Sequence, residues 1–532
     1  MFRRLDEGLK KWKKDKHPKP LMLRGARQVG KSFLVEKFAK ENFQNLIKIN
    51  FEKERNFSHH FDGDLDLKRI LETIAIIKKQ KLNIGTTLIF FDEIQECPRA
   101  IVALRYIYED IPGLHCIAAG SLLEFALEKE SISMPVGRIK YIYMYPMSFV
   151  EYLMAKNEDR LLKLIREMSL KKPIDDSLHQ HLLKEFKIYM FIGGMPEAVN
   201  NYIQEDSLKN ILDIQSSIIE TYRDDFLKYS SRARSMHVEK IFNLAPQFIG
   251  QKFKYSQIDA NLQSRELKAA LDLLCKARVY RKVLKTSGEA LPFAFHASEK
   301  HFKLLFMDVG LMHNMLNLSS ELLTNESFYN LAKGALVEQV VGQELLAYHP
   351  YNQAAELYFW NRDGRNISAE LDYLYAANDT DDENAEIIVQ QRSSNGTAAE
   401  RGSSRLRRTN NRSVRVISSD AEHVRQVSYV SKRKYKLDLS SLHEDYEDDE
   451  NAEIIVRQQC QRVFGLEVKS GARGKMKSLY SFMKEYDYHY GLALSSENIS
   501  FEKGILKVPI YAVSELDRLL KLLDKPLHDV KV

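Results

Sequence analysis

The stretch that decides the fold is PLMLRGARQVGKSFLVEKFAK, residues 20–40. It begins with a short apolar run and ends in a segment typical of a helix. Between them lies GARQVGKS, residues 25–32, which fits G-x-x-x-x-G-K-[ST] in the strand–loop–helix setting that this pattern requires. Glycines let the backbone curl so that successive N–H groups face an anion, and the amino end of the helix adds a favourable dipole. The stretch therefore predicts a phosphate-binding loop. The alternative is a glycine-rich turn without a ligand.

The residue types in this loop predict their roles. Main-chain N–H groups would hold the phosphates, Lys31 would reach the β- and γ-phosphates, and Ser32 would ligate Mg²⁺. The expected cofactors are ATP and Mg²⁺. The predicted nucleotide-binding residues are Gly25, Ala26, Arg27, Gln28, Val29, Gly30, Lys31, Ser32 and Phe33.

A second motif, TTLIFFDEIQ at residues 86–95, supports the same interpretation. Its continuous apolar run is typical of a central strand that is buried on both faces. The carboxyl end of such a strand lies beside the phosphate loop in open α/β sheets. We expect Asp92 to hold Mg²⁺ and Glu93 to orient and deprotonate the attacking water. Together the two motifs predict that the chain binds and hydrolyses ATP.

Two further residues are candidates for sensing the γ-phosphate. HCIAAGSLLEFAL, residues 115–127, reads as a third strand that ends near Ser121, whose hydroxyl could face the γ-phosphate or the lytic water. Arg138, within PVGRIKYIYMYPMSF at residues 135–149, is a candidate arginine finger, either in cis or from a neighbouring subunit. The alternatives are an N-cap for Ser121 and an ordinary surface arginine for Arg138.

The four segments RGARQVGKS, FFDEIQ, AAGSLLEF and PVGR…YPMSFVEYL resemble the AAA-type ATPases of bacteria and archaea that are often called DEXX-box ATPases. The resemblance covers about residues 1–155. It implies a carboxyl-terminal domain of unknown function, whose linking segment resembles YMFIGGMPEAV (189–199) and whose interior resembles FKLLFMDVGLMHNML (302–316).

Composition sets the remaining limits. The 532 residues carry a net charge of +6, which is compatible with nucleic acid but is not evidence for it. The four cysteines have no metal-ligand spacing, so we expect reduced thiols in a cytoplasmic protein. No apolar run has the ~18–20 residues of a membrane span, and the first residues lack a signal-peptide core, so no membrane partner is expected.

The middle of the chain is predicted to be helical. The Gly-Gly-x-Pro segment at residues 193–196 indicates a helix stop, interpreted as either a hinge or an ordinary loop. Residues 238–287 resemble a winged helix, because a helix with Leu267, Leu271 and Leu274 on one side carries basic residues on the other and precedes the basic stretch VYRKVLKTSG. A helical lid with solvated lysines is the alternative to a DNA-binding or protein-docking module.

Near the end of the chain, FGLEVKSG at residues 464–471 places Glu467 and Lys469 on one face of a strand. Asp372 lies on an earlier strand and Glu338 on a helix before it. The order resembles the PD-(D/E)xK nuclease core, which implies a metal held by Asp372 and Glu467, with Glu338 as a direct or outer ligand and Lys469 beside the water. The alternative is a half-buried ion pair.

The segment DDENAEIIV occurs at residues 381–389 and again at 448–456, 67 residues later. The sequence between the copies is polar, and residues 391–438 hold twelve basic and four acidic side chains. We interpret about 381–447 as a disordered insertion in a loop, where added length costs little. A basic arm for nucleic acid is the alternative to a tolerated passenger.

The predicted fold class is α/β, with an AAA-type P-loop NTPase on a parallel sheet, a helical or winged-helix region, and a nuclease-like α/β domain carrying the insertion. Three functions follow: an ATPase coupled to a DNA-associated carboxyl-terminal half, an ATP-switched signalling or scaffold protein with a protein partner or a second copy, and a metal-dependent nuclease. The expected domains are 1–155 (ATPase core), 156–230 (helical linker or lid), 231–296 (winged-helix-like) and 297–532 (nuclease-like).

Overall fold

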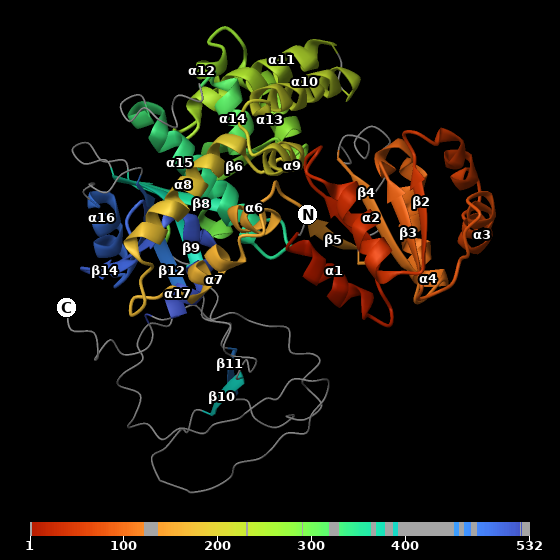
Figure 1. Cartoon of the computed structure of the whole chain (residues 1–532), viewed down its shortest axis with the longest axis horizontal. Helices are drawn as coiled ribbons and strands as arrows, with labels where there is room; N and C mark the ends of the chain where they lie inside the picture. The colour runs from red at the N-terminus through yellow and green to blue at the C-terminus, as the bar shows by residue number, and fades with distance from the viewer. Residues whose placement is uncertain are drawn as a thin grey trace, which may run out of the picture. The chain divides into compact units, whose positions relative to one another are not determined.

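A computed structural model describes residues 3–121, 137–229, 232–289, 291–318, 329–362, 369–377, 387–391, 452–456, 462–469, 476–521 and 523. The chain forms two compact units, of which one comprises residues 1–375 and 463–532 and the other residues 376–462. Figure 1 shows the chain coloured from the amino to the carboxyl terminus. The elements described below belong to the first unit unless stated otherwise.

The amino-terminal part is built on a five-stranded sheet in which every described pairing is parallel. The strand order is β2-β3-β4-β1-β5. Its strands are β1 (Leu21–Arg24), β2 (Asn45–Asn50), β3 (Thr87–Asp92), β4 (His115–Gly120) and β5 (Lys140–Tyr143). The neighbouring helices are α1 (Leu5–Lys13), α2 (Lys31–Asn42), α3 (Leu67–Ile77) and α4 (Pro98–Asp110). All residues of β3 and β4 are buried, as the apolar runs predicted.

The middle of the chain is helical, also as predicted. Helix α8 ends where Gly193 adopts φ +78°, a backbone conformation that favours glycine. A Cβ atom at Gly193 would lie 2.2 Å from the Asp308 carboxylate, which also accepts a 2.6 Å hydrogen bond from the Gly194 N–H. Asp308 caps α14 through Leu311 N–H, so the Gly-Gly segment is tied to the start of that helix. The helices are α6 (Phe149–Ala155), α7 (Asp159–Glu167), α8 (Asp176–Ile192), α9 (Pro196–Glu205), α10 (Ile211–Tyr229), α11 (Arg232–Leu244), α12 (Tyr255–Ile258), α13 (Ser264–Lys276) and α14 (Val309–Met315).

The carboxyl-terminal part is a mixed eight-stranded sheet in the order β14-β15-β13-β12-β9-β8-β6-β7. The stretch VYRKVLKTSG, which we expected to be the strand and wing of a winged helix, contains β6. This strand lies inside the eight-stranded sheet, between β7 and β8. The strands are β6 (Tyr280–Lys285), β7 (Ser298–Phe306), β8 (Leu357–Arg362), β9 (Ala369–Ala377), β12 (Arg462–Val468), β13 (Gly491–Ser495), β14 (Ser500–Glu502) and β15 (Ile505–Pro509), and the helices are α15 (Tyr329–Tyr348), α16 (Lys477–Tyr486) and α17 (Leu516–Lys521).

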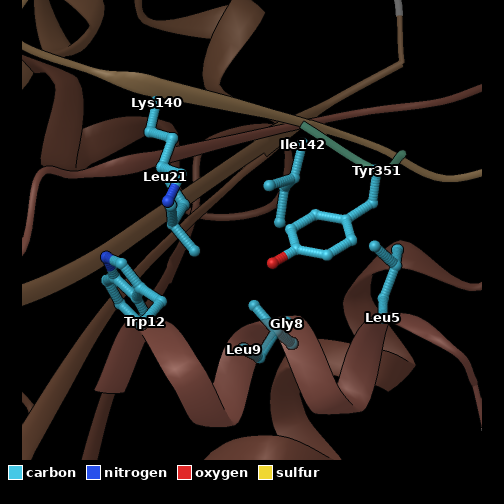
Figure 2. A pocket seen from close by; sticks show the side chains of 8 residues that line it. All are labelled: Leu5, Gly8, Leu9, Trp12, Leu21, Lys140, Ile142 and Tyr351. Carbon is cyan, nitrogen blue, oxygen red and sulfur yellow. The ribbon is translucent and has the colours of Figure 1, made fainter. Parts of the chain in front are cut away.

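Hydrogen bonds at Glu344 and Tyr351 join α15 and the chain after it to earlier parts of the chain. The Glu344 carboxylate on α15 accepts a 3.0 Å hydrogen bond from Phe149 N–H at the start of α6 and a 2.8 Å bond from the Tyr189 hydroxyl. After α15, the Tyr351 carbonyl accepts a 2.8 Å hydrogen bond from Tyr143 N–H on the edge strand β5. Figure 2 shows the Tyr351 ring over α1 at Gly8, where a Cβ atom would lie 2.5 Å from the ring. The ring closes a small apolar cavity between α1 and the sheet.

The second compact unit contains two described strands, β10 (Ile387–Gln391) and β11 (Ala452–Val456). They pair antiparallel, with Ile388 opposite Ile455, so the ends of the two copies of the repeat form one ladder. The rest of the insertion predicted at about 381–447 lies outside the described residues. In the described part of the chain, no helix combines the length and apolar character needed to cross a membrane.

Candidate functional site

The predicted phosphate loop connects β1 to α2, as the motif requires. Two glycines fix its path. A Cβ atom at Gly25 would lie 2.4 Å from the Met144 carbonyl oxygen, so only glycine fits this close approach. Gly30 precedes the first helical residue with φ +92°. The residues at 25–30 therefore form a curled connection whose end is the amino terminus of a twelve-residue helix.

The Lys31 side chain folds back onto this loop. Its ammonium group donates hydrogen bonds to the Gly25 carbonyl at 3.0 Å and to the Ala26 carbonyl at 2.7 Å. Burial lowers the pKa of Lys31 to about 8, although the Glu93 and Asp92 carboxylates act in the opposite direction. The loop thus holds a cation whose charge is only partly balanced in this structure.

Ser32 and Asp92 meet as the sequence predicted. The Ser32 hydroxyl donates a 2.9 Å hydrogen bond to Asp92 Oδ1 at the end of β3. Asp92 Oδ2 accepts a 3.2 Å bond from the Asn50 side chain and forms a 2.9 Å ion pair with Lys48, both from β2. The Ser32 hydroxyl at a helix amino terminus and the Asp92 carboxylate at a strand end are hard oxygen donors of the kind that Mg²⁺ prefers, so these residues fit the ion. Lys48 was not predicted, because the alternation along β2 marks it only as a partly exposed side chain.

Glu93 follows Asp92 with φ +49°, an uncommon conformation for a residue other than glycine. Its carboxylate accepts a 2.6 Å hydrogen bond from the Gln95 amide. The Gln95 side chain is buried and lies against Gly120 at the end of β4, where a Cβ atom would be 2.5 Å from Gln95 Oε1. Gln95 was not predicted; its place in DEIQ, two residues after the acid, is the only sequence signal for it.

The structure separates the other two predicted catalytic residues. Ser121 directly follows β4 and is buried, which places it at the same edge of the sheet as Asp92. Residues 122–136, which follow it, lie outside the described part of the chain. The structure therefore does not test whether Ser121 is an N-cap for a following helix. Arg138 precedes β5 and therefore lies at the opposite, amino edge of the parallel sheet, where it donates a 2.7 Å hydrogen bond to Glu109. This geometry does not bring Arg138 to the loop of its own chain, so a role from a neighbouring copy stays a prediction.

Residues far away in the sequence cover the outer side of the loop. The Tyr222 hydroxyl on α10 donates a 2.7 Å hydrogen bond to the Arg27 carbonyl, and the Arg27 guanidinium forms an ion pair with Asp225 on the same helix. The Arg3 guanidinium donates a 3.0 Å hydrogen bond to the Val29 carbonyl. Phe33, in the first turn of α2, is exposed. None of the partners of the loop was apparent from the sequence.

The second predicted site contains an unforeseen lysine. Lys303 on β7 is 2% exposed, and its ammonium group lies 3.0 Å from Glu338, 2.8 Å from Glu370 and 3.7 Å from Asp372. Burial acts to lower the pKa of Lys303, but the surrounding carboxylates outweigh this effect and hold the pKa above its usual value. The ammonium group therefore stays charged. Lys303 therefore pairs with Asp372 and Glu338, two of the three carboxylates expected around a metal, and with Glu370, which was not predicted.

The remaining nuclease-like residues lie beside this cluster. Asp372 also accepts a 2.7 Å hydrogen bond from Val468 N–H on β12. The neighbouring Glu467 carboxylate forms an ion pair with Lys469, which is the half-buried pair that the sequence left open. Among the described residues, no group of three or more histidine, cysteine, aspartate or glutamate side chains is arranged to hold a metal ion.

The comparisons with known proteins agree with the loop geometry. Residues 17–153 match the AAA domain family, residues 183–322 the domain of unknown function DUF8612, and residues 333–431 the domain of unknown function DUF4143. The amino-terminal part is therefore similar to AAA domains, and the parts that follow match families of unknown function. A comparison with curated proteins gives no match.

Three solved structures are among those similar to this chain. The Walker-type ATPase PABY2304 of Pyrococcus abyssi is 17% identical over 58% of this chain and 94% of its own, with a TM-score of 0.37. The Aeropyrum pernix ORC2 protein in ADPNP–ADP complexes is 12% identical over 59% and 91%, with a TM-score of 0.29. Drosophila ORC bound to DNA is 14% identical over 59% and 94%, with a TM-score of 0.23. The family match to residues 17–153 is the comparison that bears on the loop.

The Lys31 ammonium makes nucleotide affinity depend on pH. In the free protein its pKa is lowered to about 8, whereas phosphate oxygens favour the protonated form. Binding therefore takes up a proton above pH 8, and we expect ATP affinity to fall by about tenfold per pH unit as the pH rises beyond that value. Titrations with a fluorescent ATP analogue between pH 7 and 9.5 measure this. The matched control is Lys31→Arg, whose guanidinium stays charged. A wild-type profile as flat as that of the control would contradict the prediction.

Lys303 should be essential for the stability of the carboxyl-terminal sheet. Lys303→Met leaves Glu338, Glu370 and Asp372 without their central cation, and breaking a buried ion pair in this way costs about 3–5 kcal/mol of the free energy of unfolding. Urea denaturation measures the loss. Lys507→Met, which removes a more exposed lysine of β15 that pairs with Glu497 and Glu502, is the control and should cost at most about 1 kcal/mol. Equal losses in the two variants would show that the Lys303 cluster is not a buried ion-pair network.

Proposed function

We propose that the chain binds Mg²⁺–ATP at residues 25–33 and hydrolyses it. The observation that carries the proposal is the 2.9 Å contact between Ser32, at the start of α2, and Asp92, at the end of β3. It joins the two halves of a nucleotide site that lie 60 residues apart in the sequence. The AAA family match over residues 17–153 supports the same assignment.

Each side chain has a distinct role in this proposal. The N–H groups of the loop and the α2 amino terminus bind the phosphates, and Lys31 exchanges the Gly25 and Ala26 carbonyls for phosphate oxygens. Ser32 and Asp92 hold Mg²⁺, which when bound offsets the charge that develops on the phosphates. Glu93 accepts the proton of the attacking water, and the Gln95 amide fixes the direction in which the Glu93 carboxylate points.

We further propose that ATP turnover is coupled to the carboxyl-terminal half, with DNA as the partner. Helix α13 supports this, because Leu267, Leu271 and Leu274 are buried while Arg265 and Lys268 are exposed on its other side. The second candidate is an ATP-switched scaffold for a protein partner. It is favoured over a nuclease by Lys303, whose ammonium group lies where the acid cluster would otherwise take a metal ion.

The catalytic assignment predicts that binding and hydrolysis separate in one variant. Glu93→Gln keeps the shape of the site but removes the base, so it should bind ATP normally while turnover falls by about 10²- to 10⁴-fold. Phosphate release and nucleotide binding are measured on the same sample. The matched control is Glu167→Gln, an exposed carboxylate on α7 that pairs with Lys172, which should hydrolyse ATP at the wild-type rate. Unchanged turnover in Glu93→Gln would remove Glu93 from the reaction.

The proposed partner predicts how turnover responds to nucleic acid. If the carboxyl-terminal half contacts DNA, double-stranded DNA should raise the ATPase rate, and replacing Arg265 and Lys268 by Gln should remove this stimulation without lowering the basal rate. The assay is run at low and high salt, because phosphate contacts weaken as salt rises. An ATPase rate that is the same with and without DNA in both buffers would reject DNA as the partner. The second candidate, an ATP-switched scaffold for a protein, would then remain.

A further inference from the structure

The outer side of the phosphate loop is held by α10. The Tyr222 hydroxyl and the Asp225 carboxylate, one turn apart on α10, bind the carbonyl and the guanidinium of the same residue, Arg27. Tyr222 and Asp225 are 3% and 4% exposed, so this helix buries two polar side chains in order to contact one loop residue. The contact is therefore a specific docking point rather than a solvated surface pair.

The Arg27 guanidinium is also influenced by carboxylates other than Asp225. Its side chain is 27% exposed, far more than that of Asp225, and it is not enclosed by α10. Burial lowers the pKa of Arg27, but Asp225 and then Glu93 and Glu52 raise it above its usual value. Glu93 is the proposed base, so the charge of Arg27 is coupled to that of a residue assigned to the reaction.

Helix α10 connects this docking point to the eight-stranded sheet. The Tyr222 ring stacks on Phe242 of α11 with centroids 6.3 Å apart, and the Phe226 ring meets the same Phe242 at 5.1 Å. Phe242 in turn packs against Phe306 of β7 at 6.0 Å, and its carbonyl accepts a 3.0 Å hydrogen bond from the Tyr280 hydroxyl of β6. A change at Asp225 therefore acts on a packed aromatic chain that reaches the sheet.

We propose that Arg27 senses the terminal phosphate, exchanging Asp225 for the γ-phosphate of a nucleoside triphosphate and thereby weakening the contact of α10 with the loop. The inference rests on the ATP binding proposed above. A guanidinium binds a phosphate group through two parallel hydrogen bonds and prefers it to a single carboxylate contact. The exchange leaves the buried Asp225 without its partner, which weakens the docking of α10. A diphosphate lacks the competing group, so the ion pair with Asp225 persists.

The exchange makes the ratio of ATP to ADP affinity depend on the pair. In Asp225→Asn the triphosphate no longer has to displace a charged partner, so its affinity should rise by about 5- to 150-fold relative to that of ADP. Arg27→Met removes the sensor, so the affinity of the triphosphate should fall towards that of ADP. If the pair of Arg27 and Asp225 only held the fold together, the ratio of ATP to ADP affinity would shift in the same direction in the two variants. Because Arg27 is partly exposed, its variant also keeps the test valid if Asp225→Asn does not fold.

The measurement is calorimetric titration of the full chain with Mg²⁺–ADP and with the Mg²⁺ complex of the β,γ-imido analogue of ATP. Glu220→Gln is the matched control, because Glu220 pairs with Arg223 on the surface of the same helix; its ratio should equal that of the wild type. Wild-type protein that binds neither nucleotide would overturn the proposed function and this inference with it. Wild-type protein that binds both, with the two variants unchanged or shifted in the same direction, would overturn the inference alone.

Discussion

The structure depends on how the carbonyl groups of the phosphate loop are bound. In residues 25–30, Lys31 binds the carbonyls of Gly25 and Ala26, Tyr222 binds that of Arg27, and Arg3 binds that of Val29. A curled loop whose carbonyls are bound in this way turns its N–H groups towards an anion. Three separate parts of the chain therefore preorganise the loop: its own lysine, the segment before α1, and helix α10.

Other contacts explain why the amino-terminal and carboxyl-terminal parts belong to one compact unit. The chain after α15 returns to β5 and α1 through Tyr351, and Glu344 binds the first turn of α6. Burial raises the pKa of Glu344 to about 7, which is consistent with a carboxyl group enclosed between helices. The Glu344 contact is buried, and a polar group left unpaired there would be costly. A nucleotide that alters the loop thus acts on a framework that is continuous with the eight-stranded sheet.

The local parts of the site could be predicted from the sequence, because a phosphate loop and a strand ending in two acids are defined by neighbouring residues. The pairing of Ser32 with Asp92 followed from the direction of parallel strands. The same reasoning, applied to Arg138, would have placed it at the amino edge, since it precedes its strand. Asp225 and Lys303 could not be found in this way. Asp225 is 198 residues from Arg27, and Lys303 is 35 residues from Glu338, with no motif at either position.

The central claim is that main-chain amides of the loop bind the phosphates, and amide hydrogen exchange across residues 25–33 tests it most directly. The rates are compared in the free protein, with Mg²⁺–ADP, and with the Mg²⁺ complex of the β,γ-imido ATP analogue. The account predicts that both nucleotides slow exchange in this segment, while the buried strand β3 stays as slow as before. Exchange in residues 25–33 that is equally fast with and without saturating nucleotide would contradict it.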